Sequence, residues 1–185
     1  NDGSTDSTKE IVLSFNDSRL KLFDNITNQG IVKTRNTCIE KSNGKYLAVF
    51  DSDDIALPDR LKLQVEFLEN NSEYCLCGTD YQIIDSNGKP SYEMIVPKTD
   101  EDIKTYLNFN IPFCHSTMLF RSSYLKDNRY RSGFEPSEDY ELTLRLSKLS
   151  KMASLNSKTV LYRVHGNNIS LKKSTTIYNL KKEIS

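Results

Sequence analysis

The sequence has 185 residues, of which 37% are apolar and 27% charged, so it can form one domain with a hydrophobic core and is not typical of a disordered chain. Lysine plus arginine and aspartate plus glutamate each number 25, and the resulting formal net charge of zero predicts no nucleic-acid partner. The longest apolar runs, such as residues 47–50, are far shorter than the roughly 20 residues that a membrane-spanning helix needs.

Capping, turn and periodicity signals predict alternating helices and strands. In chain order these are a helix over 6–16, a strand over 20–23, a helix over 30–42, a strand over 45–50, a helix from Pro58, a strand over 75–84, a hairpin turn over 86–89, a helix over 99–109, a strand over 116–120, a helix over 137–149, a strand over 160–164 and a basic amphipathic helix from Ser170. This alternation indicates an α/β layered fold with buried parallel strands.

The helix from Pro58 carries Leu57, Leu61, Val65 and Leu68 at helical spacing, which predicts an apolar inner face. The four cysteines form no C-x-x-C pair, so we expect buried, reduced thiols rather than a zinc site or a disulfide. Reduced thiols indicate the cytoplasm.

The opening residues, N-D-G-S-T-D-S-T, predict a loop that runs into a helix. Gly3 allows a tight turn, and Ser4, Thr5 or Asp6 can cap the helix that follows. A loop of this kind usually follows a buried strand, and the sequence shows none before it.

The strongest chemical signal is Asp51-Ser52-Asp53-Asp54 at the end of the predicted strand over 45–50. Three carboxylates this close repel one another, and the carboxyl ends of such strands are where open α/β sheets bind ligands. A hard divalent cation with a nucleotide diphosphate would supply the missing positive charge. The alternative is a solvated turn with a helix cap before Pro58.

A second signal is Glu138-Asp139, at the start of the helix that Ser137 can cap. Acids at this position are also favoured by the helix dipole alone, which is the structural alternative. Asp139, however, shares a helix face with Leu142 and Leu146, so its carboxylate is predicted to point inward and is a candidate general base.

The chain has two histidines, His115 and His165, and a lone histidine is more often structural than catalytic. His165 ends a predicted strand and could add a metal ligand beside the carboxylates. The sequence contains no Walker loop, no G-x-G-x-x-G and no Ser-His-Asp set with familiar spacing.

Taken together, the motifs resemble the family 2 glycosyltransferases of the GT-A fold, which build bacterial polysaccharides and lipopolysaccharides. They are N-D-G-S-T-D, N-x-G-x-x-x-x-R-N, D-S-D-D, E-D followed by L-x-L-R-L, and Y-R-V-H-x-N-N-x-S, in the family's order. The matching segments are Asn1–Thr8, Asn28–Asn36, Lys45–Arg60, His115–Arg121, Ser137–Leu146 and Tyr162–Ser170. The resemblance implies a mixed, mainly parallel sheet flanked by helices.

The resemblance also implies a nucleotide-sugar site. Asp2 matches the acid that recognises the uracil or ribose, and Arg35 matches the arginine near the donor. Asp51 and Asp53 match the DXD motif, with Asp51 near the ribose and Asp53 on Mn²⁺ or Mg²⁺ at the diphosphate. Asp54 extends the acidic end toward the sugar.

For the reaction itself, the resemblance implies that Asp139, with Glu138 beside it, is the catalytic base of an inverting transfer. His165 matches a position that ligates the metal in some relatives, and His115 is expected on the acceptor side. The expected partners are a nucleotide sugar, with UDP as the expected nucleotide, and a saccharide or lipid-linked acceptor.

The resemblance further implies one catalytic domain over residues 1–185, with a nucleotide-binding half over 1–80 and an acceptor-binding half with a C-terminal helix over 81–185. Basic pairs in that helix, Lys172-Lys173 and Lys181-Lys182, could approach the inner face of a membrane, but a solvated helix face is the favoured interpretation.

Family members begin with a strand–helix–strand unit of about 30 residues or more before N-D-G-S-T-D. We therefore expect this chain to be N-terminally truncated, with impaired activity or with repair by dimerisation or strand borrowing. Two other functions stay open: a nucleotide- or saccharide-binding fragment without turnover, and a nucleotidyltransferase.

Overall fold

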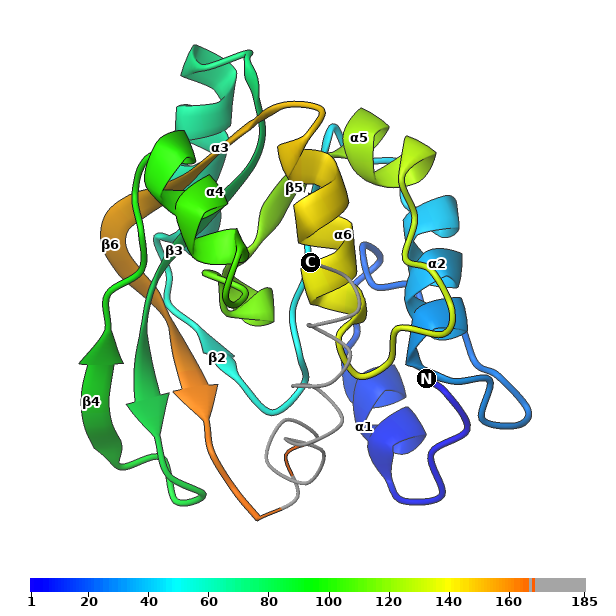
Figure 1. Ribbon diagram of the computed structural model, residues 1–185. Coiled ribbons are helices and arrows are strands. Elements are labelled where there is room, and N and C mark those ends of the chain that lie inside the picture. The colour runs from blue at the N-terminus through cyan, green and yellow to red at the C-terminus, as the bar shows by residue number, and fades with distance from the viewer. Residues whose placement is uncertain (167, 169–185) are drawn as a thin grey trace.

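The computed structural model describes residues 1–166 and 168, which form a sheet with helices on both faces (Figure 1). The helices are α1 (Thr8–Ser14), α2 (Ile31–Lys41), α3 (Arg60–Asn70), α4 (Asp100–Leu107), α5 (Ser122–Asp127) and α6 (Glu138–Ser147), with a 3₁₀ turn at His115–Thr117. The strands are β1 (Tyr46–Ala48), β2 (Ile55–Ala56), β3 (Tyr74–Ile84), β4 (Pro90–Met94), β5 (Leu119–Arg121) and β6 (Lys151–Arg163).

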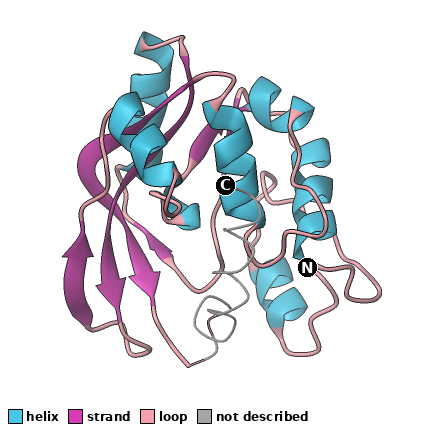
Figure 2. Cartoon of the chain, viewed as in Figure 1, coloured by secondary structure: helices cyan, strands magenta, loops and turns pink. Residues whose placement is uncertain are grey.

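The strand order is β1-β5-β3-β6-β2, and β4 pairs with β3. Figure 2 shows β3, β4 and β6 together at one side of the molecule, with α1 and α2 at the other and α6 between them. The expected mixed sheet flanked by helices is therefore confirmed.

The expectation that the sheet is mainly parallel is wrong for the described strands. Only the β3–β6 pair is parallel, whereas β1–β5, β2–β6, β3–β4 and β3–β5 are antiparallel. The physical reason is that β4 returns directly from β3 through a hairpin, where Gly88 adopts a φ of 84°. The short strands β2 and β5 also run back along their neighbours rather than following a crossover helix.

Most predicted helices and strands are present with shorter bounds, but residues 20–23 form no strand. Two hydrogen bonds instead join this segment and Asn25 to the first residue. The Asn1 ammonium donates to Phe23 O at 2.8 Å, and Asn25 N–H donates to Asn1 O at 3.0 Å. One residue of pairing is too little for a ladder. The elements β2, β4 and α5 were not predicted, and β6 begins at Lys151 rather than near residue 160.

The core has two layers because neighbouring residues of a strand point to opposite faces. Leu76 and Phe120 pack in the larger cluster, with residues of α2, α4, α5 and α6. Cys77 and Leu119 pack on the other face, against Leu68 of α3. The helices α2, α4, α5 and α6 therefore cover one face, and α3 covers the other.

The inner face of α3 differs from the predicted apolar stripe. Arg60, Gln64 and Leu68 are its buried residues, whereas Leu61 is 53% exposed. Two of the three buried side chains are polar, because backbone carbonyls of the sheet lie within their reach, as described below.

The cysteines are all unpaired, and three are buried as expected, but Cys38 is exposed. In the described part of the chain no helix is long and apolar enough to cross a membrane. The helix expected from Ser170, with both basic pairs, lies outside the described residues.

Gly78 in β3 is required by close packing. A Cβ there would lie 2.4 Å from the Phe113 ring, which is itself buried. We expect Gly78→Ala to destabilise the fold by about 1–3 kcal/mol, because the ring must shift in a filled core. Urea denaturation checks this value, and Gly166→Ala, where a Cβ meets nothing within 4 Å, is the control. Equal stability of the two variants would contradict the prediction.

Candidate active site

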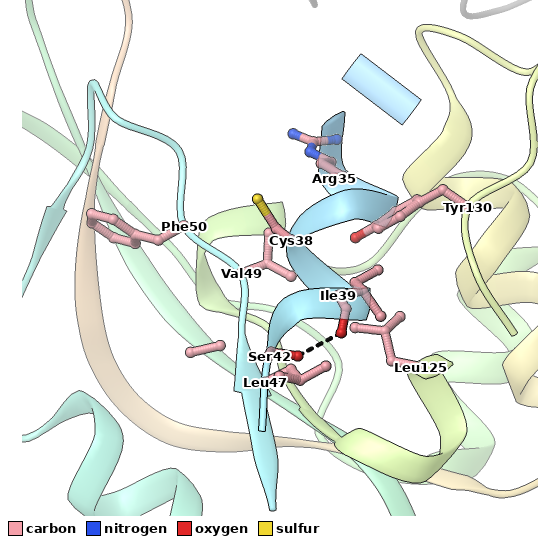
Figure 3. Close-up of a pocket in the computed structure, with 10 residues that line it drawn as sticks. Arg35, Cys38, Ile39, Ser42, Leu47, Val49, Phe50, Leu125 and Tyr130 are labelled. Carbon is pink, nitrogen blue, oxygen red and sulfur yellow. Dashed lines mark hydrogen bonds between the residues drawn. The ribbon is translucent and has the colours of Figure 1, made fainter. Parts of the chain in front are cut away.

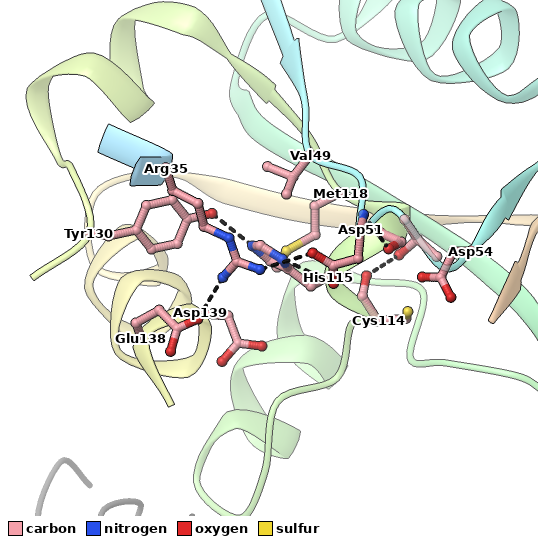
Figure 4. Close-up of polar contacts among 12 residues, drawn as sticks. Arg35, Val49, Asp51, Asp54, Cys114, His115, Met118, Tyr130, Glu138 and Asp139 are labelled. Carbon is pink, nitrogen blue, oxygen red and sulfur yellow. Dashed lines mark hydrogen bonds and ion pairs between the residues drawn. The ribbon is translucent and has the colours of Figure 1, made fainter. Parts of the chain in front are cut away.

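Arg35 joins the two predicted acidic motifs (Figure 4). From α2, its guanidinium donates to Asp51 Oδ1 at 2.9 Å and to Glu138 Oε1 at 2.5 Å. The guanidinium carbon also lies 5.7 Å from the centre of the Tyr130 ring. Arg35 thus holds the DSDD turn, Asp51–Asp54, next to the first turn of α6.

Asp51 is held in its ionised form. Burial alone would raise its pKa, but the facing His115 ring and the Arg35 guanidinium outweigh burial and lower the pKa to about 2. Its backbone N–H donates to the Ser116 hydroxyl at 3.1 Å. The first acid of the motif is therefore a fixed negative charge at neutral pH.

The two acids of α6 have different surroundings. Glu138 is 5% exposed, and burial, followed by the charge of Asp139, raises its pKa. Asp139 is half-buried, and its Oδ1 accepts the N–H of Tyr140 at 2.8 Å. We call the two ion pairs of Arg35, with Asp51 and with Glu138, the Arg35 clamp. Glu138 is therefore part of this clamp, while the Asp139 carboxylate stays accessible.

His115 lies beside Asp51 and is buried. Its Nδ1 is 3.8 Å from Asp51 Oδ2, and its Nε2 is 2.7 Å from the Tyr130 hydroxyl. The acceptor-side role expected for His115 remains a prediction that none of these contacts supports.

The structure brings Asp53 and His165 together, 112 residues apart in sequence. His165 Nε2 lies 3.0 Å from Asp53 Oδ2, and Arg163 donates from Nε to the Asp53 carbonyl at 2.8 Å. Among the described residues, no three His, Cys, Asp or Glu side chains gather as a complete metal site. The pair thus offers one carboxylate, the ligand type that suits Mn²⁺ and Mg²⁺, and one imidazole, the ligand type that suits transition metals.

Asp54 is buried rather than open to a ligand. Its Oδ1 accepts the Arg163 N–H at 2.8 Å. Burial raises its pKa, although this hydrogen bond opposes the shift. Asp54 therefore anchors the acidic turn to β6.

The opening loop is organised around Asp2. Its carboxylate accepts the N–H groups of Gln29 at 2.7 Å and Gly30 at 3.0 Å, and the Asn25 amide at 2.9 Å. The Gln29 hydrogen bond is the main cause of the lowered pKa of Asp2. Gly30, with a φ of 86°, precedes α2, so Asp2 fixes the start of the helix that carries Arg35.

A pocket of about 340 Å³ lies between α2 and β1, next to the cluster that includes Arg35, Asp51, His115 and Glu138 (Figure 3). Arg35 and Tyr130 line it together with apolar side chains such as Ile39, Val49 and Leu125. The Arg35 guanidinium thus separates an apolar hollow from the acids.

Tyr130, Ser116 and Arg163 belong to the cluster but were not predicted as site residues. Arg163 lies inside the Y-R-V-H motif, which could have identified it. Ser116 lies in the matching segment His115–Arg121, but no chemical pattern marked it there, and Tyr130 lies outside every matching segment. Only the fold brings Ser116 to Asp51 and Tyr130 to His115 and Arg35.

The lowered pKa of Asp51 makes stability depend on acid pH. A carboxyl group with a folded-state pKa of about 2, against an ordinary 3.8, stabilises the fold above pH 3.8, and this contribution is lost as the pH falls toward 2. We expect the stability gap between the wild type and Asp51→Asn to be constant near pH 6 and to shrink below pH 3.8. Urea denaturation at several pH values measures it, with Asp59→Asn as the control. A gap that does not change with pH would contradict the prediction.

The fold is that of a GT-A glycosyltransferase. S. aureus TarS 1-349 in complex with UDP-GlcNAc superposes with a TM-score of 0.75 at 20% identity, over 99% of this chain and 54% of that chain. Residues 1–128 match the family described as glycosyl transferase family 2, and the chain belongs to this family.

Two relatives are similar over most of this chain. EpsE of Bacillus subtilis (strain 168), provisionally named a glycosyltransferase, is 30% identical over 190 residues, or 99% of this chain and 66% of the relative. WfgD of Escherichia coli, named a UDP-Glc:alpha-D-GlcNAc-diphosphoundecaprenol beta-1,3-glucosyltransferase, is 30% identical over 174 residues, or 93% of this chain and 66% of the relative. This chain therefore spans less than two thirds of these relatives and about half of the TarS chain.

Proposed function

We propose that this chain is the catalytic part of an inverting, metal-dependent glycosyltransferase. It would move a sugar from a nucleotide-diphosphate sugar to a saccharide or lipid-linked acceptor in polysaccharide biosynthesis. The observation that carries the proposal is the Arg35 clamp, because it unites a DXD-type acidic turn with a helix that begins Glu138-Asp139. A donor site and a base are the two parts that such a transfer requires.

The names of similar proteins support a UDP-linked donor. TarS was crystallised with UDP-GlcNAc, and WfgD is named for UDP-Glc. For this chain we propose a UDP-sugar, with Asp2, Asp51 and Arg35 on the nucleotide side. The buried Asp54 holds the acidic turn in place beside the expected position of the sugar.

In the proposed reaction, Asp139 takes the proton of the acceptor hydroxyl. The hydroxyl oxygen forms a bond to the anomeric carbon while the bond to the diphosphate oxygen breaks, and the nucleoside diphosphate leaves with the electron pair. One displacement needs one base and no covalent nucleophile. The buried Glu138 orients the first turn of α6 through Arg35.

The Asp53–His165 pair fits a divalent cation. One carboxylate oxygen and one imidazole nitrogen lie 3.0 Å apart, and both side chains are partly exposed. Asp53 and His165 are the residues that would hold Mn²⁺ or Mg²⁺. When bound, the cation stabilises the charge of the leaving diphosphate.

Calorimetric titration of UDP, with and without Mn²⁺, tests the proposal. We expect binding that needs Mn²⁺ and is lost in Asp53→Ala, whereas the control Asp17→Ala, in an exposed pair with Arg19, binds as the wild type does. Metal-dependent release of sugar from a UDP-sugar then separates an enzyme from a binding fragment. No UDP binding by the folded chain, extended to the full length of its relatives, would overturn the proposal.

A further inference from the structure

Two buried polar side chains on α3 are not used by the reaction proposed above. Arg60 is 3% exposed and Gln64 is fully buried, one helical turn apart. Burying a guanidinium is costly, and an apolar side chain would fill this space without that cost. Their presence at the sheet face calls for a role that an apolar residue cannot fill.

Arg60 bridges the two segments that carry the site. Its Nη2 donates to the carbonyl oxygens of Val49, at 2.8 Å, and Met118, at 3.3 Å. Val49 lies two residues before Asp51, and its own N–H donates to the same Met118 oxygen at 3.2 Å. Arg60 therefore holds the strand end before Asp51 against β5 beyond the last residue pair of the β1–β5 ladder, Ala48 and Leu119.

Gln64 binds the 3₁₀ turn that faces this strand end. Its amide nitrogen donates to Thr117 O at 2.7 Å and to Cys77 O at 2.9 Å. Thr117 ends the 3₁₀ turn that also contains His115 and Ser116, both of which contact Asp51. Arg60 and Gln64 thus reach both backbone segments on which the geometry of Asp51 depends.

We infer that Arg60 and Gln64 are positioning residues that fix the DSDD turn and the His115–Thr117 turn against each other, and so set the geometry of the donor site. The part of this inference that concerns the donor rests on the proposed function. The geometric part stands on the contacts alone.

Two measurements on Arg60→Met test the geometric part without any ligand. We expect the amide hydrogen of Asp51, which bonds to Ser116, to exchange about tenfold faster. Because the chain has only two histidines, their ring signals can be resolved by NMR, and we expect the His115 signal to move and the His165 signal to stay. The third measurement is the affinity for UDP with Mn²⁺, which should fall about tenfold.

Arg121→Met is the matched control. Arg121 also donates to backbone carbonyls of the α3–β3 region, those of Leu68, Asn71 and Tyr74, but at the opposite end of α3. It should lose stability, yet keep the wild-type exchange rate at Asp51, the His115 signal and the UDP affinity. Gln64→Met should follow Arg60→Met, and Arg60→Lys, which keeps a donor, should recover part of the loss.

If Arg60→Met does not fold, Gln64→Met carries the test. Wild-type exchange at Asp51 and an unmoved His115 signal in Gln64→Met would overturn the inference. Equal changes in Arg121→Met would overturn it as well, because they would reveal a general loss of stability. Absence of UDP binding by the chain extended to the full length of its relatives would refute the proposed function, while leaving both ligand-free measurements decisive.

Discussion

Replacing Asp139 by asparagine is expected to lower sugar transfer by about 10²–10⁴-fold, the range for loss of a general base. Asparagine keeps the shape of aspartate but cannot take the acceptor proton. Within the described residues, the Asp139 carboxylate accepts the neighbouring Tyr140 N–H, and an asparagine oxygen can accept this hydrogen bond equally well. Stability and UDP affinity should therefore stay close to the wild type while turnover of the UDP-sugar falls.

Glu138→Gln provides the comparison for this prediction. Glutamine retains an oxygen for Arg35 and removes a buried negative charge, so its main effect should be on the clamp. Turnover that survives in Asp139→Asn and disappears in Glu138→Gln would assign the base to Glu138 and reverse the roles proposed for the pair.

Arg35→Met should destabilise the fold by roughly 3–5 kcal/mol, the cost of removing one partner of a buried ion pair. Glu138 is buried, and the loss of Arg35 leaves its carboxylate without the cation that balances it. Asp51 loses one of the two groups that keep its pKa low. Urea denaturation at neutral pH measures the change in the free energy of unfolding.

Arg19→Met is the matched control for this stability effect. Arg19 pairs with Asp17 at 2.6 Å, but its side chain is 89% exposed. An exposed pair contributes about 0–1 kcal/mol, so the control should be nearly neutral. A loss of less than about 1 kcal/mol in Arg35→Met would show that the clamp does not stabilise the fold.

Local signals predicted the parts of the site that lie within single elements. The acids of Asp51–Asp54 follow β1 because an apolar run ends there, and Asp139 shares its helix face with Leu142 and Leu146, which are fully buried as expected. The inner face of α3 was predicted wrongly, because helical spacing identifies a face but not the carbonyls that Arg60 and Gln64 meet.

Contacts between distant segments could not be predicted from local patterns. Arg35 and Glu138 are 103 residues apart, and the pairing of His115 with Tyr130 depends on how the chain crosses after α5. The parallel direction expected for most strands was wrong for the same reason. Alternation of helix and strand favours parallel pairing through crossover helices, and it cannot show that β2 and β5 pair antiparallel with their neighbours.

The parallel pairing of β3 with β6 has a consequence for how the chain folds. The register runs from Tyr74 opposite Lys151 to Ile84 opposite Arg163, so the longest ladder of the sheet joins segments separated by the whole of β4, α4, α5 and α6. Closing so large a loop costs entropy before any ladder bond forms, and such topologies fold slowly. During synthesis the β3–β4 hairpin can form early, but the edge of β3 that receives β6 stays open until Arg163 has left the ribosome. Over that interval the incomplete chain exposes the unpaired N–H and C=O groups along this edge of β3. Pairing with β6 covers them and so prevents β3 from pairing with another chain.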